Sequence, residues 1–265
     1  MSKHILVFDS GLGGTHILQA LQQQLPDNCY SYALDNAAFP YGDKTDRFLV
    51  ERSISLFQRL IDESQPDLVI IACNTASTLL LEPLRAAHSK PFIGVVPAIK
   101  PAAKISRSKV LALLATPATI NRTYIDKLIQ AHAAACQVVR YSHPDLVMLA
   151  ENKLTGVAVN KQQMQEILKP LKQHPLANKI DTFVLGCTHF SAIQEELAAA
   201  WQADALWLDS TDAIVRRTGQ LLGQINDNRR QASGCIYMTS ATNKDILLKS
   251  LEMHKLSECR IIEMG

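Results

Sequence analysis

The chain has 265 residues, of which 47% are apolar and 20% charged, and its formal net charge is +2 at pH 7. A globule of this length buries about 75% of its extended-chain surface, so it can form one large or two modest domains without disulfides. The charge is too close to zero to indicate a nucleic-acid partner, and no apolar stretch reaches the length that crosses a bilayer, so we expect no membrane association. The first nine residues run into a strand-like segment without the apolar region and cleavage site of a secretory signal, so we expect a cytoplasmic protein.

Cysteine usage agrees with a reducing compartment. The six cysteines are widely scattered, and such thiols are normally unpaired: Cys29, Cys73, Cys136, Cys187, Cys235 and Cys259. The sequence contains no Cys-x-x-Cys pair, and Cys187 with His189 alone is too sparse for a zinc site. We therefore expect no metal.

Short apolar runs alternate with longer amphipathic stretches from the first residues onward. The strand-like runs cover residues 5–8, 30–34, 68–72, 92–96, 110–115, 138–141, 183–186 and 206–208. Residues 46–64 and 119–134 carry apolar side chains at three- and four-residue spacing, which predicts helices that cover a sheet. This alternation predicts an α/β fold with doubly wound, mainly parallel sheets.

Two prolines at 97 and 101 interrupt regular structure just after a strand and suggest a domain boundary. We expect a first domain of residues 1–97 that is completed by residues 211–265, and a second domain of residues 98–210. The tail is too short to stand alone. Its strand-like and helix-like segments at 235–240, 245–253 and 260–263 are expected to return to the first domain.

The most informative feature is a pattern that occurs twice, at residues 67–75 and 181–189. Each copy has an aspartate, an apolar run of strand length, a cysteine six places on, and then small polar residues that can begin a helix. Ligands bind at the carboxyl ends of strands in open α/β sheets, so Cys73 and Cys187 are candidates for two acid/base groups that act on one atom. The alternative is that both are small buried residues that end strands. The duplication favours the first interpretation.

A glycine-rich turn, residues 9–15, follows the first strand and leads into a helix that begins near Thr15. Such turns let backbone N–H groups approach an anion. His16 stands where a dinucleotide fingerprint has its third glycine, and the Gly-Lys-Ser/Thr of a P-loop is absent, so a carboxylate fits as well as a phosphate. Asp9 either orients an amino group or a thiol, or caps the helix.

Three further segments place polar groups at the ends of strands. Tyr41 and Gly42 lie in a turn, where the tyrosine hydroxyl could reach a polar ligand or the turn could be the segment's only role. Asn74 and Thr75 follow Cys73, as Thr188 and His189 follow Cys187. A helix N-terminus beside a thiol stabilises the thiolate, and His189 is the expected proton partner of Cys187. The other four cysteines lack such surroundings, so we interpret them as structural.

Six segments in matching order together resemble the glutamate racemases of the aspartate/glutamate racemase family. The resemblance runs from about residue 6 to residue 217, and the segments that carry it are Phe8–Gly14, Asp35–Gly42, Ala72–Ser77, Gly94–Ala98, Leu114–Thr119 and Leu185–His189. The resemblance implies two flavodoxin-like domains in a pseudo-symmetric arrangement. It also implies a cofactor-independent isomerase that makes D-glutamate from L-glutamate for peptidoglycan, and so for cell-wall biogenesis and cell shape.

The same resemblance implies roles for individual residues. Cys73 and Cys187 would be the two acid/base thiols, the first acting on the D enantiomer and the second on the L enantiomer, with assistance from Asp9 and His189 respectively. The substrate would be held by Asp9, Ser10, Tyr41, Gly42, Asn74, Thr75, Thr188 and His189.

The sequence departs from the family pattern at two places. Ser191 stands where the family has proline after its second cysteine, and residues 142–145 replace a Cys-Pro segment. Glu151 matches an acidic family position near the site, although the alternative is a solvated helix carboxylate.

Other functions remain open at this point. Aspartate racemases and related isomerases also use two cysteines, and a module that binds phosphate or a nucleotide could carry inert cysteines on the same fold. The sequence leaves open a homodimer, activation by a cell-wall nucleotide precursor and an interaction with DNA gyrase, which some family members show.

Overall fold

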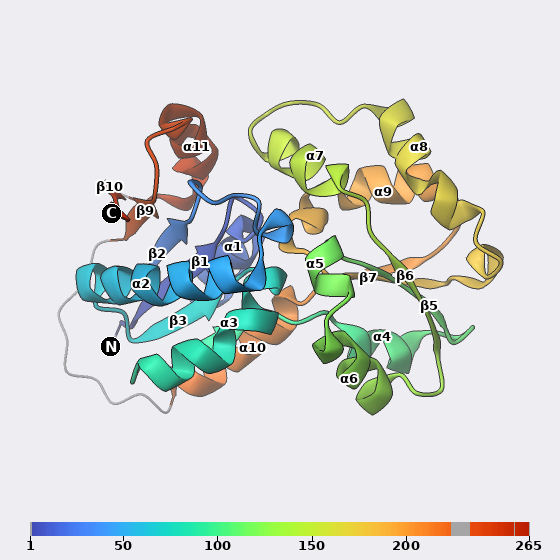
Figure 1. Cartoon of the computed structure of the whole chain (residues 1–265), viewed down its shortest axis with the longest axis horizontal. Helices are drawn as coiled ribbons and strands as arrows, with labels where there is room; N and C mark the ends of the chain where they lie inside the picture. The colour runs from blue at the N-terminus through green and yellow to red at the C-terminus, as the bar shows by residue number, and fades with distance from the viewer. Residues whose placement is uncertain (1, 224–233, 257, 265) are drawn as a thin grey trace. The chain divides into compact units, whose positions relative to one another are not determined.

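The computed structural model describes residues 2–223, 234–256 and 258–264. These residues form two compact units (Figure 1): unit 1 is Met1–Val95 with Thr211–Gly265, and unit 2 is Val96–Ser210. Each unit has its own parallel sheet, and in the described ranges no helix is long and apolar enough to cross a membrane.

Unit 1 begins and ends with strands. Its strands are β1 (His4–Asp9), β2 (Cys29–Leu34), β3 (Leu68–Ile71), β4 (Phe92–Gly94), β9 (Cys235–Met238) and β10 (Glu258–Ile261). Its helices are α1 (Thr15–Gln24), η1 (Tyr41–Asp43), α2 (Asp46–Ser64), α3 (Asn74–Ala87), α10 (Thr211–Leu222), α11 (Lys244–Leu251) and η4 (Glu252–His254), where η marks a 3₁₀ helix.

Unit 2 is built in the same alternating way. Its strands are β5 (Val110–Leu114), β6 (Gln137–Tyr141), β7 (Thr182–Leu185) and β8 (Leu206–Leu208). Its helices are α4 (Ile99–Ile105), α5 (Pro117–Ile120), α6 (Thr123–His132), α7 (Asp145–Leu154), α8 (Lys161–Lys172), η2 (Ala177–Lys179), η3 (Thr188–Ile193) and α9 (Gln194–Trp201).

The two sheets share one strand order. Unit 2 has the order β6-β5-β7-β8, and unit 1 contains the matching order β2-β1-β3-β4 within its larger sheet β10-β9-β2-β1-β3-β4. All pairs are parallel, so β1 corresponds to β5 and β3 to β7. The predicted α/β class with parallel sheets is confirmed.

Helices cover both faces of each sheet, and the central strands β1, β3, β5 and β7 are buried along their whole length. In unit 1, α2 packs beside α3 and α1 beside α10, and the α2/α3 side forms a core around Phe8, Phe57 and Ile71. The helix predicted over residues 46–64 is found as α2, where the Thr45 side chain accepts a hydrogen bond from the N–H of Phe48 and so caps its first turn. In unit 2, α4 and α6 contribute to one core and α8 packs against α9 (Figure 1).

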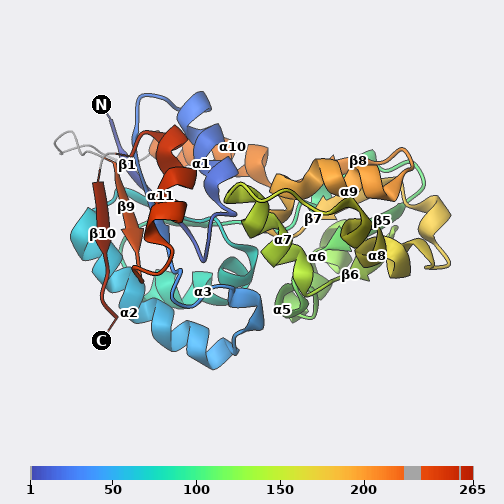
Figure 2. The same cartoon turned by 90° about the horizontal axis from the view of Figure 1, so that it is seen from above.

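The C-terminal segment returns to the first sheet. Strand β9 pairs with β2, with Tyr32 opposite Ile236, and β10 adds the edge of the sheet. Figure 2 shows this red segment beside the blue N-terminal strands. The residues at the carboxyl end of β2 therefore gain contacts from a segment about 200 residues later in the chain.

One predicted helix differs from the structure. Residues 119–134 were expected to form one helix, but they contribute to α5 and α6, which are separated at Asn121 and Arg122. The Thr116 side chain caps α5 by accepting a hydrogen bond from the N–H of Thr119, so this helix begins earlier than expected. Arg122 then has an extended backbone (φ −77°, ψ 139°), which ends the first helix and begins the second.

The aspartate that opens each repeated segment anchors the start of its strand. The N–H of Asp67 donates to the His4 carbonyl, and the N–H of Asp181 donates to the Val110 carbonyl. The Asp181 carboxylate also accepts four bonds of 2.7–2.8 Å, from the Ser106 and Thr182 hydroxyls and the backbone N–H groups of residues 107 and 108. Burial opposes the ionised form of Asp181, but these donors outweigh it and hold the pKa of the carboxyl well below its usual range.

We predict that Asp181→Asn lowers the free energy of unfolding of unit 2 by about 1–2 kcal/mol at neutral pH, because an amide cannot accept all four bonds. The folded-state pKa is depressed, so the stabilisation is present above the unfolded-state value of about 3.9 and is lost as pH falls toward the folded-state value. Urea unfolding between pH 7 and pH 2 measures the free energy of unfolding of wild type and variant. The difference between the two free energies should shrink below about pH 4. Asp204→Asn, at an exposed position of the same unit, serves as the control; a difference independent of pH would contradict this account.

Candidate active site

Cys73 and Cys187 occupy equivalent positions. Each lies two residues beyond the end of its strand, β3 or β7, and each is the residue immediately before a helix. Their backbones are nearly identical, with φ −138° and ψ 120° at Cys73 and φ −140° and ψ 132° at Cys187. Both residues are 7% exposed. The repeated sequence pattern therefore produces a repeated local structure.

A hydrogen bond to the neighbouring strand fixes the residue before each cysteine. The N–H of Ala72 donates to the Phe8 carbonyl at 2.6 Å, and the N–H of Gly186 donates to the Leu114 carbonyl at 2.7 Å. Each bond extends the ladder past the end of the strand and places the next residue, the cysteine, beside the carboxyl end of β1 or β5. Equivalent backbone bonds thus present the two thiols.

The glycine-rich turn lies against the Cys73 segment. A Cβ atom at Gly14 would stand 2.8 Å from the Ala72 Cβ, so only glycine lets the turn approach so closely. Asp9 ends β1 next to this point and is fully buried, and its Oδ1 accepts the Ser10 N–H at 2.5 Å. Asp9 and Ser10 therefore lie at the strand end adjacent to Cys73.

Asn74 and Thr75 form the first turn of α3 and are both 3% exposed. The Nδ2 amide of Asn74 is buried and has no hydrogen-bond partner among the residues that the structure describes. Burying such a donor costs about 1–3 kcal/mol unless an acceptor satisfies it. An amide in this state beside a cysteine is suited to a bound carboxylate.

Tyr41 belongs to a buried polar cluster centred on Asp35. Its hydroxyl donates to Asp35 Oδ2 at 2.6 Å, while Arg52 binds both carboxylate oxygens at 2.6 and 2.7 Å and the Thr239 hydroxyl donates to Oδ1 at 2.6 Å. Burial, then the charge of Asp35 and the hydrogen bond to it, raise the pKa of Tyr41 well above its usual value, and the Cys73 charge adds to this effect. The Tyr41 hydroxyl thus donates its proton to Asp35. Its oxygen can therefore only accept a hydrogen bond from any further group.

His189 connects Cys187 to Glu151. The Nδ1 atom of His189 lies 4.0 Å from the Cys187 sulfur, and Nε2 lies 2.8 Å from Glu151 Oε2. Both side chains are largely buried, at 3% exposure for His189 and 11% for Glu151. A carboxylate that fixes the orientation of an imidazole beside a thiol is an arrangement suited to proton transfer. The alternative reading of Glu151 as a solvated carboxylate is wrong.

The predicted site residues fall into two groups, one in each unit. In unit 1 the carboxyl ends of neighbouring strands, and the helices that follow them, carry Asp9, Ser10, Tyr41, Gly42, Cys73, Asn74 and Thr75. In unit 2, Cys187, Thr188 and His189 lie in one turn. Sequence reasoning gave no role to Asp35, Arg52 or Thr239. A role for Asp35 could have been proposed from its place directly after β2, because Asp9 at the end of β1 is paired with the preceding residue, Leu34.

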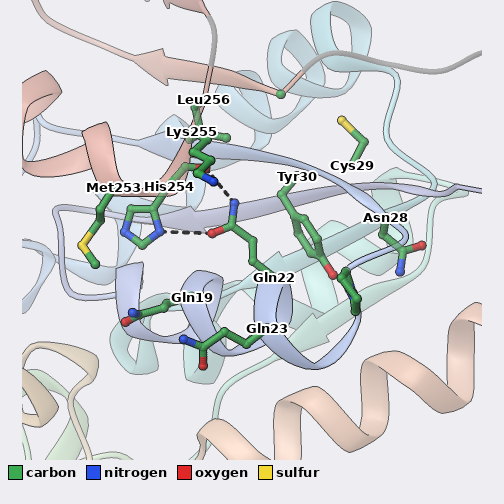
Figure 3. Close-up of a pocket in the computed structure, with 12 residues that line it drawn as sticks. Gln19, Gln22, Gln23, Asn28, Cys29, Tyr30, Met253, His254, Lys255 and Leu256 are labelled. Carbon is green, nitrogen blue, oxygen red and sulfur yellow. Dashed lines mark hydrogen bonds between the residues drawn. The ribbon is translucent and has the colours of Figure 1, made fainter.

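A pocket of about 560 Å³ lies elsewhere in unit 1 (Figure 3). It borders the amino end of β2, at Cys29 and Tyr30, whereas the predicted site residues lie at carboxyl ends. The Gln22 side chain crosses it and donates to the His254 carbonyl at 2.8 Å. This pocket contains none of the predicted site residues.

Residues 10–218 match the Asp/Glu/Hydantoin racemase family. The chain belongs to this family. It is 43% identical to the glutamate racemase of Shewanella loihica, over 91% of this chain and 89% of the relative. It is 42% identical to that of Aliivibrio salmonicida, over 95% and 93%. A solved structure of Escherichia coli glutamate racemase, in complex with L-glutamate and the activator UDP-MurNAc-ala, is 37% identical, covers 99% of both chains and has a TM-score of 0.94. The predicted family is confirmed.

We predict that Arg52→Gln lowers the free energy of unfolding of unit 1 by about 3 kcal/mol, because it leaves the fully buried Asp35 without its charge partner. Arg47→Gln on the same helix is the matched control, since the Arg47–Glu51 pair is largely exposed, with 87% and 65% of the side chains accessible. That control should cost less than about 1 kcal/mol. Thermal or urea unfolding measures both variants. Equal losses of unfolding free energy in Arg52→Gln and Arg47→Gln would contradict the structural role of the Asp35 cluster.

Proposed function

We propose that this chain is a cofactor-independent glutamate racemase that interconverts L- and D-glutamate through Cys73 and Cys187. The observation that carries the proposal is the matched placement of two buried cysteines, each past a strand end and before a helix. Relatives named glutamate racemase, at 42–43% identity over most of the chain, support the substrate. We further propose that the reaction supplies D-glutamate for peptidoglycan in the cytoplasm.

The chemistry requires two groups because a proton leaves one face of Cα and another returns to the opposite face. A thiolate on one side takes the Cα proton, and the electron pair left on carbon then accepts a proton from the thiol on the other side. After one turnover the thiol and thiolate have exchanged roles, so each direction of the reaction uses both sulfurs. Following the family resemblance, Cys187 takes the proton of L-glutamate and Cys73 that of D-glutamate.

The polar residues at the unit 1 strand ends would bind the substrate. Negative charge develops on the α-carboxylate as the Cα proton leaves, so buried donors aimed at that group lower the barrier. The unsatisfied Nδ2 of Asn74 is suited to this task, and Ser10 and Thr75 are also buried. Asp9 would assist Cys73, and the segment of Tyr41 and Gly42 would lie along one side of the bound substrate.

His189 would assist Cys187 on the unit 2 side, with Thr188 as a further substrate contact. We assign Glu151 a positioning role: its hydrogen bond to Nε2 holds the ring so that Nδ1 faces the sulfur. The structure of E. coli glutamate racemase with its activator UDP-MurNAc-ala supports a related proposal, that a cell-wall nucleotide precursor activates this chain as well. We also propose that the two compact units are the two racemase domains.

We predict that the purified chain racemises L- and D-glutamate without added pyridoxal phosphate, and that Cys73→Ser or Cys187→Ser lowers kcat by at least about a thousandfold in both directions. Circular dichroism of the amino acid follows the reaction. Cys136→Ser, at a partly exposed cysteine outside the site, should retain full activity. Turnover of aspartate alone would overturn the substrate, and racemisation that survives both serine variants would overturn the two-thiol mechanism.

We predict that Glu151→Gln lowers kcat by about tenfold to a hundredfold, because His189 loses the charged acceptor that fixes its ring. Glu195→Gln, at an exposed carboxylate on α9, is the matched control and should leave kcat unchanged. Full activity of the Glu151 variant, with its melting temperature intact, would show that the His189–Glu151 pair has no part in catalysis.

A further inference from the structure

Ser191 is one of the two places at which the sequence departs from the family pattern, and its side chain has a specific partner. Its hydroxyl donates to Asp209 Oδ2 at 2.8 Å. Ser191 is the fourth residue of η3, the 3₁₀ helix that begins directly after Cys187. Asp209 is the first residue after β8.

This hydrogen bond connects η3, which follows Cys187, to the end of strand β8, which pairs with the strand that precedes Cys187. Strand β7 leads into Gly186 and Cys187, and η3 then carries the chain to Ser191. Strand β8 is paired with β7, with Leu208 opposite Val184, so Asp209 extends beyond β8 near the end of β7. The Ser191–Asp209 bond therefore ties the far side of the turn back to the sheet that presents the thiol.

Other contacts also hold the Cys187 turn, among them the bond from the Phe190 N–H to the Cys187 carbonyl and the hydrogen bond between His189 and Glu151. Runs of 3₁₀ helix longer than three or four residues are uncommon because their hydrogen-bond geometry is poor, and η3 has six residues. The Cys187 side chain makes no capping hydrogen bond to this helix, whereas Thr45 and Thr116 cap α2 and α5. Buried Phe190 and Ile193 fix the apolar side of η3, and Ser191 fixes the polar side through a charged acceptor.

We propose that Ser191 is a positioning residue for Cys187, and that the Ser191–Asp209 hydrogen bond holds the thiol and His189 in register with the reacting carbon. The proposal rests on the function proposed above. Asp209 has further interactions, so the test concerns Ser191, whose hydroxyl can be removed alone.

An isotope effect, rather than a rate alone, is needed to show which of the two sulfurs a variant affects. Enantiomers have equal free energies in water, so any variant lowers kcat/KM equally in both directions, and rates alone do not show which sulfur is affected. Deuterium at Cα resolves this, because it is transferred to Cys187 from L-glutamate and to Cys73 from D-glutamate. A higher barrier at Cys187 makes deuterium transfer from L-glutamate more rate-limiting. It makes deuterium transfer from D-glutamate to Cys73 less rate-limiting.

We expect Ser191→Ala to lower kcat/KM by between about tenfold and a hundredfold. The Cα-deuterium isotope effect on kcat/KM should rise for L-glutamate and fall for D-glutamate. Ser191→Thr, which keeps the hydroxyl, should restore wild-type values. Ser250→Ala, which removes a serine hydroxyl from exposed helix α11, is the matched control and should change neither quantity.

A second measurement does not depend on racemase activity. Alkylation by iodoacetamide, followed by mass spectrometry of each cysteine, should be several-fold faster at Cys187 in Ser191→Ala than in wild type, and unchanged at Cys73. Wild-type protein that fails to racemise glutamate would overturn the proposed function, whereas unaltered isotope effects or unaltered Cys187 alkylation in Ser191→Ala would overturn the positioning role. Loss of activity that Ser191→Thr does not restore would also overturn it.

Discussion

The candidate site depends on one backbone constraint that occurs twice. In each unit a hydrogen bond from the residue before the cysteine to the neighbouring strand extends a parallel ladder by one step, at Ala72–Phe8 and Gly186–Leu114. A parallel ladder brings the carboxyl ends of adjacent strands to the same edge of the sheet, so the residue that follows must emerge there. The matching dihedral angles of Cys73 and Cys187 are the direct result. Without this repeat, two cysteines 114 positions apart in sequence would be ordinary buried thiols.

The repeat ends at the thiols, and the groups around them differ. Near Cys73 the polar cluster is centred on Asp35 and includes Tyr41, with part of it supplied by Thr239 after β9. Near Cys187 the corresponding polar group is the His189–Glu151 pair, in which α7 supplies Glu151 and η3 supplies His189. Similar backbones thus carry chemically different surroundings. This difference is consistent with two thiols that meet opposite faces of a chiral substrate and need not be equivalent.

Much of the fold could be predicted because its signals are local. Helix α2 has the predicted bounds, since a capping threonine and regular apolar spacing define it within its own sequence. Predicting α5 and α6 as one helix was wrong, because the break depends on the backbone conformation of Arg122 rather than on apolar spacing. Site residues that share a strand end with a cysteine could be proposed from the sequence. The contacts of Glu151 with His189 and of Asp35 with Thr239 could not, because they join residues 38 and 204 positions apart and depend on tertiary packing.

The central claim is that two sulfurs act on opposite faces of one carbon. It is tested most directly by the entry of solvent deuterium at Cα, measured by NMR in D₂O. Each enantiomer is incubated with each of the two variants in which one catalytic cysteine is replaced. The account predicts that Cys73→Ser, which retains Cys187, exchanges the Cα proton of L-glutamate much faster than that of D-glutamate, and that Cys187→Ser shows the reverse preference. Exchange with the same enantiomer preference in both variants, or undiminished racemisation in either, would contradict it.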